Sequence, residues 1–139
     1  MTPTEQAVLD SVTQLLESYA RRDIAGCMAA ISTSRAILLL GTNENEVLKT
    51  PDEVRATFRR DFEHMRDIAW GAPRIAQVMA AADLAGLLLE LPLRYSSFGT
   101  GVSTVYRYAL MLAREEGRWK VFAGMASVPH PARLPEPVK

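Results

Sequence analysis

The sequence has one cysteine, no net charge and no long apolar run, and each absence excludes a class of protein. A single cysteine, Cys27, cannot form an intrachain disulfide, so nothing points to an oxidising compartment. Sixteen basic residues balance sixteen acidic ones, which gives no electrostatic reason to expect nucleic acid or an anionic membrane as a partner. No signal-peptide pattern opens the chain, and its apolar runs are too short to span a bilayer. We therefore expect a cytoplasmic protein with neither partner.

Motifs for nucleophilic, nucleotide-dependent and metal-dependent catalysis are also missing. There is no Gly-x-Ser-x-Gly elbow, no dinucleotide-binding Gly-x-Gly-x-x-Gly and no phosphate-binding loop. Cys27, His64 and His130 do not stand at metal-ligand spacing. We therefore expect no metal and no cofactor. We interpret Cys27 as core packing and His64 as a solvated or partly buried helix residue.

Helix-start signals divide the first half of this 139-residue chain, a length typical of one domain. Residues 2–5 combine a capping box with proline at the first helical position, and residues 50–53 repeat the Thr-Pro-x-Glu pattern. The first apolar stripe ends near residue 22, and Asp23 caps a shorter helix that runs to Ile31. The third helix carries its apolar stripe as far as Met65. The sequence therefore predicts three helices.

Strand signals fill the rest of the chain. Residues 35–40 indicate a buried strand, followed by a turn and a short second strand before the third helix. Four longer strand-like runs with short connections, typical of antiparallel hairpins, cover residues 74–81, 84–95, 102–114 and 118–128. Helices followed by a strand meander predict an α+β fold over residues 1–129. Residues 130–139 are expected to form a Pro-rich extended tail.

Several of these features occur together in one known family. They are Asp23 before the short helix, Leu39-Leu40-Gly41-Thr42-Asn43 leading into Glu46, the helix start at residues 50–53, and Arg107, Trp119 and Ser127 near the end. In these features the chain resembles the SnoaL-like domains of the nuclear transport factor 2-like superfamily, which includes ketosteroid isomerase and polyketide cyclases. The resemblance covers about residues 4–129. It implies a cystatin-like cone: three N-terminal helices packed on a strongly curved, mostly antiparallel sheet around an apolar cavity.

The resemblance also argues against ketosteroid isomerase chemistry. That reaction needs a carboxylate base and two oxyanion donors, a tyrosine and a protonated acid. By the resemblance the base falls on Leu39, or on Leu40 if one residue has been inserted. The first-helix tyrosine falls on Leu15, the third-helix tyrosine on Phe58 and the protonated acid on Ala109. None of these side chains can exchange a proton, so we do not expect the isomerase mechanism.

SnoaL-like relatives with this ending often carry an acid after the Gly-Thr turn and a histidine in the last strand. Asn43 and Met125 stand at those two positions here. Polyketide cyclases of the superfamily use an acidic general acid/base, and the resemblance supplies no matching acid. Ring closure by that route is not expected either.

Arg107 is the charged residue that the resemblance places inside the cone. Strand alternation puts it on one face with Ala109 and Met111, and by the resemblance that face looks into the cavity. A buried arginine needs an anionic partner, which the sequence could supply as Glu90 or Glu46, or which a ligand carboxylate could provide. An internal salt bridge and a ligand anchor both stay open.

The resemblance and this alternation together predict a mostly apolar pocket wall. Its expected members are Leu15, Tyr19, Leu39, Phe58, Phe62, Trp70, Arg107, Ala109, Met111 and Phe122. The first hypothesis is a non-catalytic pocket for a small hydrophobic molecule, with or without a carboxylate. The second is an isomerase, cyclase or lyase acting on a polyketide- or steroid-like substrate through unconventional groups such as Tyr19, Tyr108 and Arg107. The third is an interaction module whose own side chains fill the cone.

The last strand predicts a partner subunit. From Trp119 onward the chain is apolar at both odd and even positions, although a one-layer sheet packs its helices on one side only. An apolar outer face suggests that another subunit covers it. Together with the dimers common in the superfamily that the chain resembles, this predicts a homodimer through the outer face of the sheet.

Overall fold

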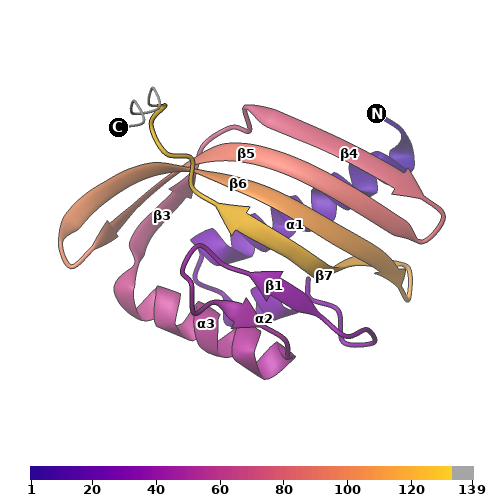
Figure 1. The fold of residues 1–139 in the computed structure, drawn as a ribbon, viewed down its shortest axis with the longest axis horizontal. Helices are drawn as coiled ribbons and strands as arrows, with labels where there is room; N and C mark the ends of the chain where they lie inside the picture. Colours follow the sequence, from indigo (N-terminus) through magenta and orange to yellow (C-terminus); the bar gives the residue numbers. More distant parts are fainter. Residues whose placement is uncertain (133–139) are drawn as a thin grey trace, which may run out of the picture.

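The computed structural model describes residues 1–132, in which three helices lie on one face of a curved seven-stranded sheet (Figure 1). The elements are α1 (Pro3–Ala20), α2 (Ile24–Met28), β1 (Leu38–Leu40), β2 (Val47–Leu48), α3 (Pro51–His64), β3 (Arg66–Trp70), β4 (Ile75–Ala81), β5 (Leu84–Ser97), β6 (Thr100–Glu115) and β7 (Arg118–Ser127). The predicted α+β class is confirmed, with three N-terminal helices packed on a curved, mostly antiparallel sheet. Of the expected tail 130–139, residues 130–132 form no helix or strand, and residues 133–139 lie outside the described part.

The helices begin at the predicted caps. The Thr2 hydroxyl accepts the backbone N–H of Glu5, whose carboxylate accepts the backbone N–H of Thr2, so the capping box is complete. The side chains of Asp23 and Thr50 each accept a backbone N–H in the first turn of α2 and α3. The helix α2 is shorter than predicted, because the chain leaves it to form a bridge with β7.

The sheet has the strand order β2-β1-β7-β6-β5-β3, and β4 also pairs with β5. The strand β1 runs parallel to β7, and the other pairs are antiparallel. The four predicted hairpin strands correspond to β4–β7. The strand β3 was not predicted: the expected third helix ends at His64, because Met65 already has an extended backbone (φ −117°, ψ 136°). That early end lets β3 close the sheet edge against β5.

The two faces of the sheet differ in what covers them. The inward side chains of β5 are almost fully buried. Ala85, Leu87, Leu89 and Leu91 form the centre of the core with α1, and Leu93 joins a neighbouring cluster with Phe62. The opposite face, here called the outer face, is apolar but exposed. Register aligns Leu38, Ala123, Met111, Gly86 and Met79 across it in one row. Among residues 1–132 no helix packs on the outer face, and Figure 1 shows α1 passing behind strands β4–β7.

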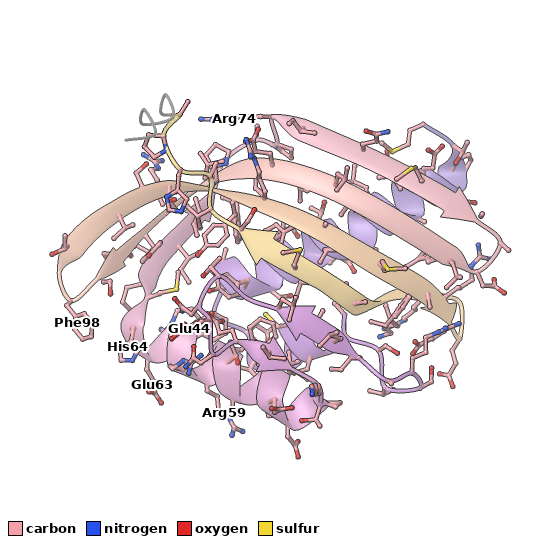
Figure 2. All side chains as sticks on the ribbon, viewed as in Figure 1. Glu44, Arg59, Glu63, His64, Arg74 and Phe98 are labelled. Atoms are coloured by element: carbon pink, nitrogen blue, oxygen red, sulfur yellow. The ribbon has the colours of Figure 1, made fainter. Side chains whose placement is uncertain are left out.

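Cys27 lies in the core, whereas His64 is exposed at the surface. Cys27 is fully buried, and burial raises the pKa of its thiol to about 12, so it stays protonated and packs as a small apolar side chain. His64 ends α3 and its ring lies against that of Phe98 at the tip of the β5–β6 hairpin, tilted by 42°, with ring centroids 5.3 Å apart (Figure 2). Within the described residues, no group of three or more His, Cys, Asp or Glu could hold a metal ion, and no helix is long and apolar enough to cross a membrane.

Candidate functional site

A cavity of about 420 Å³ lies between the helices and the inner face of the sheet. This volume is typical of a site for a small molecule. Most of its wall is apolar. Its aliphatic members from α1, β1, β2, α3 and β6 include Val12, Leu15, Leu16, Leu39, Leu48, Val54 and Leu110. The cone is therefore hollow and not filled by its own side chains.

Five of the residues proposed from sequence line this cavity. They are Leu15, Tyr19, Leu39, Phe58 and Trp70. Phe62 does not line it: it is buried in a neighbouring cluster with Cys27 and Ile68. Phe122 packs against the main core while the Arg35 guanidinium lies 5.3 Å from its ring centroid, so it is also outside the wall.

The prediction that Arg107, Ala109 and Met111 of β6 point into the cavity was wrong. Arg107, Ala109 and Met111 do share a face, as alternation requires, but it is the outer one, because Tyr108 between them points into the cavity. The Arg107 side chain is 57% exposed, and its Nε donates to the Glu90 carboxylate at 3.0 Å. The structure thus gives Arg107 a protein partner on the surface and leaves no arginine, among the described residues, to anchor a ligand carboxylate in the cavity. Because the Arg107 side chain is largely exposed, its ion pair with Glu90 contributes little to stability.

The polar part of the wall centres on Tyr19 and Asp61. The Tyr19 hydroxyl, from α1, donates to the Asp61 carboxylate on α3 at 2.8 Å and lies 3.4 Å from the sulfur of Met65. Burial raises the pKa of Asp61, although the hydrogen bond from Tyr19 lowers it. Burial, followed by the charge of Asp61, raises the pKa of Tyr19, so its hydroxyl stays protonated. Asp61 is therefore a half-buried carboxylate held in one orientation.

Aromatic rings surround this pair. Trp70 on β3 is the centre, with its ring centroid 6.0 Å from that of Tyr19, 6.1 Å from Tyr106 and 6.2 Å from Tyr108. The Trp70 indole N–H donates to the backbone carbonyl of Leu16 at 3.0 Å, which fixes the ring. Tyr106 and Tyr108 stack at 5.9 Å, and burial raises the pKa of both. We call Tyr19, Asp61, Trp70, Tyr106 and Tyr108 the tyrosine–aspartate cluster.

A second carboxylate, Glu46, faces the cavity from the turn between β1 and β2. Its Oε1 accepts the side-chain amide of Asn43 at 2.6 Å and the Asn43 backbone N–H at 3.2 Å. The backbone packs closely here: a Cβ added at Gly41 would lie 2.5 Å from Glu46 Oε2. The Gly-Thr-Asn turn of the sequence thus holds an acid at the wall, at Glu46 and not at Asn43.

The cluster supplies chemistry that the sequence pattern alone does not indicate. Asp61 and Tyr106 were not among the proposed pocket residues. Tyr19 lies one helical turn beyond Leu15, and Asp61 lies nearly one turn beyond Phe58, the two positions where the resemblance implies tyrosines. The arrangement can donate hydrogen bonds from neutral phenols, accept them at Asp61, and hold a proton on a half-buried carboxylate.

The comparisons with known proteins agree with this architecture. Residues 8–131 match the model of a family described as SnoaL-like domain. A ketosteroid isomerase-like protein from Erwinia carotovora atroseptica SCRI1043 superposes with a TM-score of 0.79 at 18% identity, over 94% of this chain and 100% of that one. A proposed dehydratase of the NTF2-like family from Streptomyces avermitilis gives 0.82 at 16% identity, over 94% and 100%. Identities this low show a shared fold alone, and no curated protein matches the chain in sequence.

Proposed function

The chain belongs to the SnoaL-like domain family, and we propose that it binds a small, mostly hydrophobic molecule in the cone. The observation that carries the proposal is the cavity of about 420 Å³ with an aliphatic wall and one polar cluster. A pocket that is largely apolar, with a few convergent polar groups, suits a ligand whose body is apolar and whose one end is polar. The placement of Arg107 on the outer face removes the reason to expect a carboxylate on that ligand.

A bulky side chain in the wall tests the binding proposal. Leu15→Trp is expected to abolish the fluorescence gain of the neutral dye Nile red, because the added indole occupies the space between α1 and the sheet. The gain is measured by titrating dye into wild type and variant under identical conditions. Leu84→Trp is the matched control, since Leu84 is an exposed leucine at the start of β5, away from the wall. Equal dye binding by wild type and Leu15→Trp, or none by wild type, would contradict the proposal.

Acid–base catalysis is the second candidate, and the pair Tyr19–Asp61 is the observation that favours it. A half-buried carboxylate with a raised pKa can remove a proton from a carbon next to a ketone and return it. The electron pair moves onto the carbonyl oxygen, which neutral tyrosines of the cluster can stabilise by hydrogen bonding. These residues differ from the catalytic residues of ketosteroid isomerase. Proton transfer at a carbon next to a carbonyl group is nevertheless a step that this cluster can perform.

Deuterium exchange measures such a step without the natural substrate. Wild type is expected to accelerate exchange of the α-protons of 2-tetralone in D₂O, followed by NMR, and Asp61→Asn is expected to lose about 100-fold or more of that acceleration. Glu63→Gln is the control, because Glu63 is exposed on the same helix and points away from the cone (Figure 2). Acceleration that survives in Asp61→Asn would eliminate Asp61 as the base.

We further propose a homodimer through the outer face. The occupant is a second copy of this chain, because the face is mostly apolar and is built largely of short or flexible side chains that can interdigitate with themselves. Met111 and Met125 are each 50% exposed at its centre, next to Ala109 and Ala123. The paired charges of Arg107 and Glu90 border it and neutralise one another. An apolar patch of this kind is typical of a protein–protein interface.

A further inference from the structure

The charges on the cavity wall have one sign only. Asp61 and Glu46 line it, and among the described residues no lysine, arginine or histidine does. The sequence as a whole has as many basic as acidic residues, so its composition does not explain this bias. A hollow with low-dielectric walls and two acids concentrates negative potential, which attracts cations and repels anions.

Aromatic side chains are concentrated at the same site. The sequence has four tyrosines, and all four line the cavity together with Phe58 and Trp70. The negative face of an aromatic ring attracts a cation that lies within about 6 Å of its centroid, and tryptophan and tyrosine do so best. Trp70 has three tyrosine rings within 6.2 Å of its own centroid, close enough for several rings to contact one small group.

From this combination we infer that the ligand is an organic cation, an amine or quaternary ammonium with an apolar body; the inference rests on the proposed binding function. The ammonium group lies against the rings of the cluster and beside the Asp61 carboxylate. The apolar body fills the aliphatic part of the cavity around Leu15 and Leu39. Aromatic rings and a carboxylate together replace the water that a cation loses on burial.

The other ligand classes fit the wall less well. An anion would meet two carboxylates and, within the described part of the chain, no basic side chain, because Arg107 lies on the outer face. A neutral ligand would leave the charge of Asp61 with one hydrogen bond, from Tyr19, in a site that burial makes unfavourable for that charge. A bound cation compensates the negative charge of Asp61. Asp61 then contributes to binding, in addition to being a charge whose burial is unfavourable for folding.

Two probes of equal shape separate charge from hydrophobicity. Benzyltrimethylammonium carries a permanent positive charge, and neopentylbenzene is its neutral carbon isostere. Each competes against Nile red bound to wild type, to Asp61→Asn and to the control Glu63→Gln. The amide introduced by Asp61→Asn keeps the shape and the acceptor for Tyr19 but not the charge. We expect Asp61→Asn to weaken the ammonium by about tenfold or more and the isostere by less than about twofold, and Glu63→Gln to change neither.

The competition experiment distinguishes a failure of the cation inference from a failure of the binding proposal. If both probes weaken equally in Asp61→Asn, or if the isostere competes and the ammonium does not, the cone binds small molecules but not through a cation, and the inference is overturned. It is also overturned if Nile red binds in the cone and neither probe competes. If Nile red does not bind in the cone at all, the binding proposal itself fails.

The pH dependence gives a second readout, because benzyltrimethylammonium does not titrate. A bound cation favours the ionised form of Asp61, and burial has raised the pKa of Asp61. The affinity of the protein for benzyltrimethylammonium should therefore fall as the pH drops through that pKa. The affinity of the isostere should not fall. The other groups that face Asp61 are Tyr19, Tyr106 and Tyr108, whose raised pKa values keep them neutral, together with Glu46, Arg60 and His64. The same pH series is repeated in Glu46→Gln and His64→Gln. If the fall in affinity persists in both variants, it belongs to Asp61; if it disappears in one of them, it belongs to the residue replaced there.

Discussion

Replacing Gly124 by alanine is expected to lower the free energy of unfolding by about 3 kcal/mol. Gly124 lies in β7 at the cavity wall, between Leu39 of β1 and Leu110 of β6 in the register. A Cβ added there would lie 2.5 Å from the carbonyl oxygen of Ala109 and 2.8 Å from a methyl carbon of Leu110. Its φ of 156° is also one that residues with a side chain rarely adopt. The neighbouring strand is fixed backbone, so it cannot move aside cheaply.

Gly86→Ala is the matched control. Gly86 also lies within the sheet, but its added Cβ would meet only the terminal methyl of Met79 at 3.8 Å. We therefore expect Gly86→Ala to change stability by less than about 0.5 kcal/mol. Urea denaturation of the three proteins gives the comparison, and a loss of about 3 kcal/mol corresponds to a thermal midpoint lower by about 10 °C. Equal stabilities of the two variants would show that β7 shifts to accommodate the side chain.

Local signals explain why so much of the fold could be predicted. The caps Thr2, Asp23 and Thr50 bond to backbone groups three residues away, so the sequence around each helix start determines it. The hairpins of β4–β7 depend on turn residues at 82–83, 98–99 and 116–117, which are equally local. The strand β3 lacks such a signal. Asp67 there has φ of 53° and the register shifts between Arg66 and Ala69, which breaks the alternation that identifies a strand.

The inner wall was harder to predict because both faces of β6 look alike in sequence. Alternation correctly grouped Arg107 with Ala109 and Met111, but alternation does not say which of two apolar faces meets the helices. The tyrosines at 106 and 108 point inward and the arginine outward. A strand face that points to solvent is usually polar, and this normally identifies the outward side. The outer face here is apolar, so the sequence of β6 does not show which side is outward. The same feature that predicted the dimer thus obscured the pocket.

Asp61 could not be found because its role depends on a distant partner. On α3 it stands directly after Arg59 and Arg60, which is typical of the solvated side of a helix. Its hydrogen bond to Tyr19 joins residues 42 positions apart, and only the packing of α1 against α3 brings them together. The resemblance implies acids on the strands and in the turn, at Leu39, Ala109 and Asn43, and only tyrosines on the helices, at Leu15 and Phe58. Here the polar groups lie about one helical turn further along both helices.

Replacing Met111 by lysine is expected to convert a dimer into a monomer. Met111 lies at the centre of the outer face, aligned with Ala123 on one side and Gly86 on the other. A two-fold interface contains each substitution twice, so a cost of about 2 kcal/mol per buried lysine weakens association by about 4 kcal/mol, or roughly a thousandfold. Sedimentation equilibrium across a concentration series measures the shift.

The control and the interpretation of this experiment follow from the two layers of the fold. Ala56→Lys adds the same charge on the exposed side of α3, in the helical layer, and should leave the dimer intact. A wild-type protein that is monomeric at all concentrations would contradict the dimer directly. A dimer that persists in Met111→Lys would show that the subunits associate through another surface. Nile red titration of the monomeric variant then decides whether the cavity is complete within one chain: dye binding that survives dissociation would show that the partner subunit contributes nothing the dye needs.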